Sequence, residues 1–144
     1  MEVAALRRAI PAAIDALGGA SRGSELGDDA WAIYRGPLTG YVALLNPEGA
    51  GDADPVIHVT FPILRVPETG AEALFRRLLE LNHEQGDFAC FSLDPRGTVW
   101  LGAGRFAVDL DEAELRSLIA EVATLAERYN DELLERFGRE LAVG

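Results

Sequence analysis

The chain has 144 residues, of which 24 are acidic and 13 are basic, so its formal net charge is -11. This length suits a single domain with one hydrophobic core, and no apolar run reaches the roughly 18 residues that a transmembrane helix needs. The negative charge argues against direct binding of DNA or RNA, because an acidic surface repels the phosphate backbone.

The first segment predicts an amphipathic helix over Glu2–Leu17, because its apolar residues recur every three or four positions. Pro11 lies within this segment and lacks a backbone donor, which predicts a kink or a new helix start at that point. Gly18 and Gly19 predict the end of the helix.

Three strands are predicted next, over Trp31–Tyr34, Tyr41–Leu45 and Val56–Leu64. The first two are separated by a short Gly-Pro segment that is typical of a hairpin connection. Glycines, prolines and acidic residues in Asn46–Pro55 predict a flexible surface loop.

A second helix is predicted over Gly70–Asn82, opened by a capping box in which Thr69 and Glu72 satisfy free helix amides. Two more strands follow, over Asp87–Leu93 and Thr98–Phe106. The four residues between them contain proline and glycine in positions that favour a tight turn. This pattern predicts a second hairpin.

The last helix is the best specified element of the sequence. Asp111 and Glu114 form a second capping box, and Gly138 predicts the end of the helix. The region from Asp109 to Glu140 contains ten acidic residues against four arginines, so its outer side is acidic.

The resulting order of elements is α-β-β-β-α-β-β-α. Hairpin-sized connections favour an antiparallel sheet, and amphipathic helices must cover at least one of its faces. We therefore predict a single α+β domain over residues 1–144, with a five-stranded antiparallel sheet and three helices.

Strand residues alternate between the two faces of a sheet, which predicts one apolar face and one mixed face. The apolar face, covered by helices, is assigned to Trp31, Ile33, Val42, Leu44, Ile57, Val59, Phe61, Ile63, Val99 and Leu101. The mixed face is assigned to Tyr34, Tyr41, Ala43, His58, Thr60, Cys90, Ser92 and Trp100. Aromatic residues with a polar tip are enriched where proteins meet partners. The mixed face is either an interaction surface or a surface that the long helix covers.

No residue pattern predicts a catalytic or metal site. The two histidines, His58 and His83, lack zinc-ligand spacing, and Cys90 stands alone among apolar residues. We therefore expect no metal, no cofactor and no enzymatic activity. The alternative is a ligand-binding domain or enzyme that uses a pocket between sheet and helices, with His58 or Cys90 in it.

The single cysteine fits a reducing compartment, and charged residues interrupt the first 17 positions as no signal peptide would allow. Both features predict a cytoplasmic protein.

The second half of the chain resembles a known family. The segments that carry the likeness are Leu78–Asn82, Phe91–Asp94, Thr98–Leu101, Asp109–Asp111 and Ala126–Tyr129. Together they resemble YbjN-type domains, which share their fold with the type III secretion chaperone-like superfamily.

This resemblance implies a small acidic protein, usually a homodimer, that binds other proteins through its sheet and first helix without catalysing a reaction. Secretion chaperones of this fold hold extended segments of a client, whereas YbjN-type members are associated with regulation and stress responses. No residue set in this sequence decides between the two roles.

The sequence therefore predicts a non-enzymatic, homodimeric protein-binding module, either a chaperone-like adaptor or a stress-response regulator. A subunit of a larger assembly is a further alternative. The candidate dimer anchors are Leu74, Leu78, Phe91 and Trp100. The candidate client-binding residues are Leu6, Ile10, Tyr34, Tyr41 and Phe61, although Phe61 falls on the predicted core face. The negative charge favours a basic client, and a DNA- or RNA-binding protein would meet that requirement.

Overall fold

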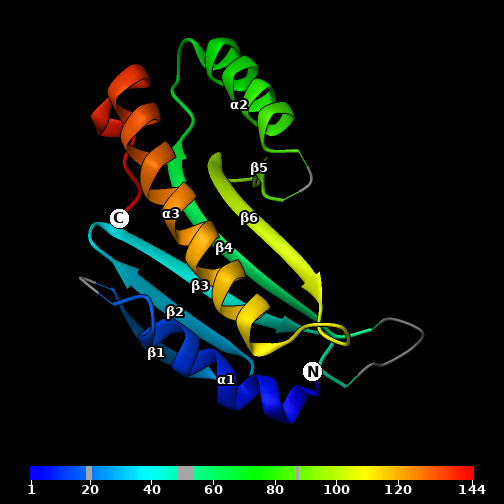
Figure 1. Ribbon diagram of the computed structural model, residues 1–144. Coiled ribbons are helices and arrows are strands. Elements are labelled where there is room, and N and C mark those ends of the chain that lie inside the picture. The colour runs from blue at the N-terminus through cyan, green and yellow to red at the C-terminus, as the bar shows by residue number, and fades with distance from the viewer. Residues whose placement is uncertain (19–20, 49–53, 87) are drawn as a thin grey trace.

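A computed structural model describes residues 1–18, 21–48, 54–86 and 88–144 of the chain. It shows an α+β fold in which the strands and helices follow each other along the chain as predicted, with one additional strand (Figure 1). Part of the loop predicted over Asn46–Pro55, residues 49–53, lies outside the described residues.

The helices are α1 (Val3–Asp15), α2 (Ala71–Gln85) and α3 (Glu112–Phe137), followed by a short 3-10 helix, η1 (Arg139–Leu141). The strands are β1 (Ser21–Gly27), β2 (Ala30–Arg35), β3 (Leu38–Leu45), β4 (Val56–Arg65), β5 (Cys90–Leu93) and β6 (Thr98–Phe106). They form one sheet in the order β1-β2-β3-β4-β6-β5, and every neighbouring pair is antiparallel.

The prediction of five strands was wrong, because the sheet has six. The missed strand, β1, is an edge strand that pairs only with β2, and all but its first residue are exposed. An exposed edge strand needs no apolar alternation, so its polar sequence carries no strand signal. It forms because β2 offers it a free row of backbone donors and acceptors.

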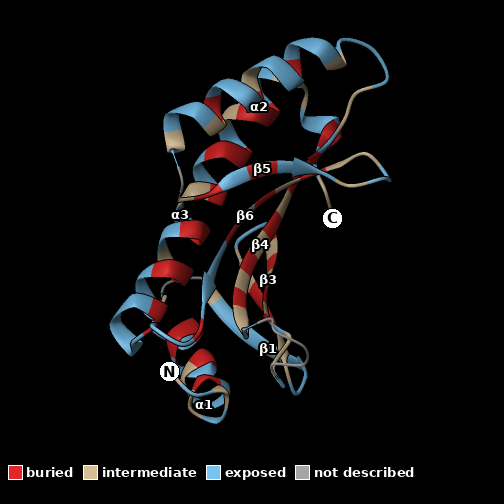
Figure 2. Ribbon diagram, turned by 90° about the vertical axis from the view of Figure 1, so that its right-hand side faces the viewer, coloured by how far each residue is buried: buried red, intermediate tan, exposed pale blue. Residues whose placement is uncertain are grey.

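Two helices, α1 and α3, lie on one face of the sheet (Figure 2). The ten residues assigned to the covered face are all buried, which confirms that prediction. The opposite face, called the open face below, carries no helix within the described part of the chain (Figure 2). Helix α2 lies beside β5 and α3 at one end of the molecule (Figure 1).

The long strand β4 contains a bulge between Pro62 and Leu64, where its register with β6 shifts. The buried side chain of Asn130 on α3 donates a hydrogen bond to the Ile63 carbonyl there, at 3.1 Å. A bulge leaves a backbone group without its ladder partner, so this asparagine fixes α3 to the sheet at the point of irregularity.

One of the two predicted capping boxes is confirmed. At the start of α3, the Glu114 amide donates to the Asp111 carboxylate and the Asp111 amide donates to the Glu114 carboxylate. At α2 the prediction was wrong, because the helix starts one residue later and Gly70, at φ 79°, occupies the N-cap without a side-chain hydrogen bond. Thr69 therefore does not cap this helix.

Helix α1 runs through Pro11 without restarting. Pro11 is exposed, so the carbonyl that loses its helical donor can bond water instead. The helix buries Leu6, Ile10 and Ile14 against the rest of the core.

Three residues that carried the family resemblance have structural roles. Asn82 exchanges two hydrogen bonds with the backbone of Phe91 and so joins α2 to β5. Tyr129 packs edge-on against the Phe91 ring, with centroids 5.5 Å apart. Asp94 accepts two backbone amides in the β5–β6 turn, from Arg96 and Thr98.

Candidate functional site

The open face carries the residues assigned to it from the sequence. All eight are exposed or partly exposed, which confirms the assignment. Strand pairing sets them in rows across the sheet, for example Tyr41 opposite Thr60, which in turn lies opposite Gly102. The face therefore combines aromatic side chains with small ones and remains accessible to another molecule.

The aromatic part of this face, called the aromatic patch, consists of Tyr34, Tyr41 and Trp100. The rings of Tyr41 and Trp100 contact each other across the sheet, with centroids 6.2 Å apart. The Arg22 guanidinium lies 5.0 Å from the centre of the Tyr34 ring. All three aromatic residues are partly exposed, so the patch offers apolar area and hydrogen-bonding tips to a partner.

Trp100 is held in place by the neighbouring turn. Its indole Nε1 donates to the Asp94 carboxylate at 2.9 Å. This hydrogen bond, with those from the Thr98 and Arg96 amides, lowers the pKa of Asp94 from its usual 3.8. An orienting bond of this kind limits the side-chain entropy that Trp100 would lose on binding a partner.

His58 lies on the open face, in the inner strand β4, between Ala43 of β3 and Gly104 of β6. A Cβ atom added at Gly102 would come within 3.4 Å of its Nε2, and one at Gly104 within 3.4 Å of its Cδ2. The imidazole therefore rests over two glycines of β6. Partial burial lowers the pKa of His58 from its ordinary 6.5, which keeps the ring neutral at pH 7.

In an NMR titration, His58 is expected to show a midpoint below 6.5. Because the unfolded chain binds this proton more readily than the folded one, the free energy of unfolding should fall as the pH drops below 6.5 and passes through that midpoint. In the His58→Gln variant, the free energy of unfolding, measured with urea at several pH values, should no longer show this fall. A midpoint at or above 6.5 would show that the ring is not desolvated.

A Cys–His catalytic pair is not formed. Cys90 lies opposite Gly102 on β6, whereas His58 lies opposite Gly104 on the other side of β6. The His58 ring extends over Gly102, the residue opposite Cys90, yet among the described residues no hydrogen bond joins the Cys90 thiol to the imidazole. Within the described residues, no three histidine, cysteine or acidic side chains gather as metal ligands would.

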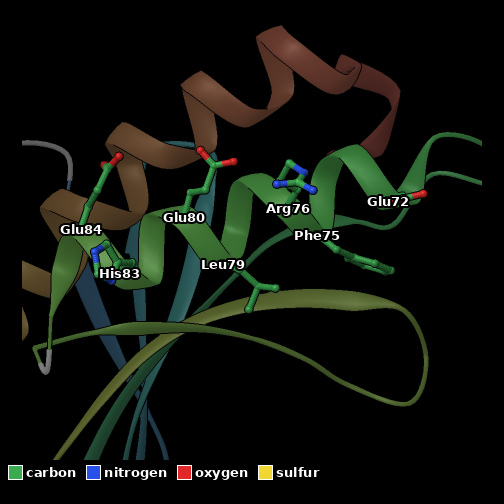
Figure 3. A pocket seen from close by; sticks show the side chains of 7 residues that line it. All are labelled: Glu72, Phe75, Arg76, Leu79, Glu80, His83 and Glu84. Carbon is green, nitrogen blue, oxygen red and sulfur yellow. The ribbon is translucent and has the colours of Figure 1, made fainter.

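The outer side of α2 is a second exposed apolar surface, called the α2 surface. Phe75 and Leu79 point to one side of the helix, while Glu80 and Glu84 point to the other (Figure 3). These residues, with Glu72, Arg76 and His83, line a shallow groove of about 600 Å³. Leu79 is 69% exposed and lies beside the exposed ring of Phe75, so the two residues give α2 an exposed apolar surface.

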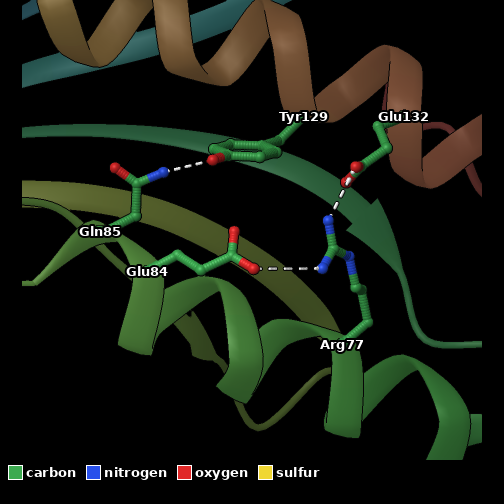
Figure 4. Close-up of polar contacts among 5 residues, drawn as sticks. All are labelled: Arg77, Glu84, Gln85, Tyr129 and Glu132. Atoms are coloured by element: carbon green, nitrogen blue, oxygen red, sulfur yellow. Dashed lines mark hydrogen bonds and ion pairs between the residues drawn. The ribbon is translucent and has the colours of Figure 1, made fainter.

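The inner side of α2 is tied to α3 by polar contacts (Figure 4). Arg77 donates to Glu132 on α3 at 2.9 Å and lies 3.7 Å from Glu84. The hydrogen bond to Glu132 raises the pKa of Arg77, and Gln85 donates to the Tyr129 hydroxyl. Helix α2 is thus anchored on one side, and its other side is left to solvent.

The candidate dimer anchors are placed differently from one another. Leu74, Leu78 and Phe91 are buried within the chain, whereas Trp100 is partly exposed on the open face. The large apolar residues that α2 exposes are Phe75 and Leu79.

The candidate client-binding residues also divide into two groups. Tyr34 and Tyr41 are partly exposed on the open face and belong to the aromatic patch. Leu6, Ile10 and Phe61 are fully buried in the core, on the helix-covered side of the sheet.

No helix among the described residues combines the length and the hydrophobicity needed to cross a lipid bilayer.

Comparison with known proteins identifies the family. A family model described as "T3SS (YopN, CesT) and YbjN peptide-binding chaperone 1", or TY-Chap1, matches residues 4–143. Among solved structures, a chain of the ExsC–ExsE complex is similar with a TM-score of 0.65 at 19% identity, over 91% of this chain and 96% of that chain. No curated protein sequence matches. This chain belongs to the TY-Chap1 family, as the resemblance to YbjN-type and secretion-chaperone domains predicted, and it has the fold seen in the ExsC–ExsE complex.

Proposed function

We propose that this member of the TY-Chap1 family is a non-enzymatic, chaperone-like adaptor that holds a segment of a client protein against its open face. The observation that carries the proposal is the aromatic patch, in which partly exposed Tyr41 and Trp100 contact each other and Asp94 holds the indole. Tryptophan and tyrosine are the residues most often responsible for binding energy at protein interfaces.

Two further facts support a protein client. The family is described by its binding of peptides, and the structural neighbour was solved in a complex of two named components. The net charge of -11 favours a basic client, whose association would be accelerated by the field of the protein. A DNA- or RNA-binding protein of the cytoplasm has the required charge.

The direct test of this function is to place a photo-crosslinking residue on the open face and to identify what is attached to it. A client protein recovered from this face, and not from the α3 side, would support the proposal. No attachment at the open face would refute it.

We also propose that the protein forms a homodimer through the α2 surface. Phe75 and Leu79 supply an apolar centre, and Arg76 beside Glu72 and Glu80 supplies charges of both signs. A two-fold axis would allow Arg76 of each copy to meet a glutamate of the other copy, as a self-complementary isologous contact allows.

Leu79→Arg is expected to convert the dimer into a monomer in sedimentation equilibrium, because it puts a charge at the apolar centre of the contact. The side chain is 69% exposed, so the folded monomer should tolerate it. Ser117→Arg is the matched control, since it adds the same charge at an exposed position of α3. The dimer proposal fails if the unmodified protein is already monomeric at micromolar concentration, or if both variants dimerise equally.

A further inference from the structure

The end of the open face opposite the aromatic patch carries a second apolar surface. Leu45 lies opposite Val56, and Val56 lies opposite Phe106, so the three side chains form one row across β3, β4 and β6. Leu45 is 48% and Phe106 is 62% exposed. We call this the basal row; the strand ends that form it meet near the N-terminus (Figure 1).

Acidic residues flank the basal row on both sides. The Leu44 amide donates to the Asp29 carbonyl at 2.8 Å, which places the β1–β2 turn beside the row. On the other side, the Ala107 amide donates to the Pro55 carbonyl at 2.9 Å, and Asp54 lines a hollow with Val108. Glu48 follows the row three residues after Leu45.

Part of this negative charge is neutralised within the chain, by Arg7 and by the Met1 ammonium, which donates to the Ala107 and Val108 carbonyls. Arg7 forms an ion pair with Asp29 at 2.8 Å, and this contact, with the nearby charges of Asp28 and Glu48, raises the pKa of Arg7. Among the described residues, Asp28, Glu48 and Asp54 have no ion-pair partner within 4.0 Å.

We propose that the basal row and its acidic rim bind a segment of a partner protein in which an apolar side chain is flanked by lysine or arginine. The apolar row supplies contact area, and the rim selects positive charge. A second copy of the chain does not suit this surface, because an isologous contact would bring the acidic rim against itself. The proposal rests on the proposed function in that the partner is the same client.

The spacing between the two surfaces constrains that client. Phe106 and Trp100 are six residues apart on β6, which corresponds to about 20 Å along the strand. A client that occupies both surfaces therefore carries its basic apolar segment about six extended residues from the segment held by the aromatic patch. Binding at one surface raises the effective concentration of the client at the other.

The test uses a short fluorescein-labelled peptide with phenylalanines flanked by arginines in a glycine–serine background, and measures its anisotropy. Phe106→Ser and, separately, Leu45→Ser are expected to weaken binding about tenfold, while melting temperatures confirm that each variant is folded. A peptide with glutamate in place of arginine is expected not to bind.

The charge variants separate a local site from the general field of the protein. Neutralising the rim with Glu48→Gln and Asp54→Asn should weaken binding several-fold, whereas Glu121→Gln with Glu135→Gln, an equal charge change on exposed positions of α3, should have less than a twofold effect. Equal effects of the two pairs, or normal binding by Phe106→Ser, would overturn the proposal. So would self-association that Phe106→Ser abolishes, because a second copy would then cover the row.

Client binding by variants of the two surfaces separates a wrong basal site from a wrong adaptor function. If variants of the basal row still bind the client while variants of the aromatic patch do not, the basal site is refuted and the adaptor function stands. If the aromatic variants have no effect on the client, the adaptor function as proposed is refuted whatever the peptide does.

Discussion

Phe61→Ala is expected to lower the free energy of unfolding by about 3–5 kcal/mol. The side chain is fully buried in the middle of β4, and its ring fills the space above Gly40, where an added Cβ would lie within 2.6 Å of three ring atoms. Because Gly40 has no side chain, it cannot fill the cavity that alanine leaves. For a domain with a typical stability of about 5–15 kcal/mol, such a loss is severe.

Urea unfolding followed by circular dichroism measures this loss, and Phe106→Ala is the matched control. The control removes the same ring from the neighbouring strand β6, at a position that is 62% exposed, so it should cost less than about 1 kcal/mol. The conservative Phe61→Leu variant, if folded, should bind the client normally. A cost for Phe61→Ala close to that of the control would contradict the packing described here.

The second large effect is expected for Tyr41→Ala and Trp100→Ala, each of which should weaken client binding by about 2 kcal/mol, or about 30-fold. Both rings are partly exposed, so the fold should survive their loss. Since the rings contact each other at 6.2 Å, the two effects are not expected to add independently. Calorimetry with the client recovered by crosslinking provides the measurement.

Two milder substitutions serve as controls for the aromatic patch. Trp100→Phe keeps an aromatic ring but removes the donor to Asp94, so it should weaken binding less than Trp100→Ala and show how much the orienting bond contributes. Tyr41→Phe keeps the ring contact and removes only the hydroxyl. Affinity within twofold of the unmodified protein for both alanine variants would show that the client binds elsewhere.

Most of the fold follows from local patterns. Alternation in β4 is strong enough to assign both faces, because Ile57, Val59 and Phe61 each point to the core. Strand β1 was not predictable, since an exposed edge strand carries no such pattern. The error at Thr69 arose because the sequence motif does not reveal that Gly70 adopts a positive φ and moves the helix start by one residue.

The site was predictable only in part, for a related reason. Periodicity identifies apolar positions but does not distinguish the inner from the outer side of a helix that is apolar on both. Leu74 and Leu78 are buried, whereas Phe75 and Leu79 are the large apolar residues that α2 exposes. The basal row was missed because Leu45, Val56 and Phe106 lie at strand ends, and only the register of three strands brings them together.

The central claim is that a client protein binds the open face, and photo-crosslinking in living cells tests it most directly. Benzoylphenylalanine at Tyr34 or Ser92 lies on the open face, and the same residue at Ser117 lies exposed on α3 as a control. We expect one basic protein to be attached at both open-face positions and not at Ser117. Attachment of equal strength at Ser117, or attachment only of a second copy of this chain, would contradict the account.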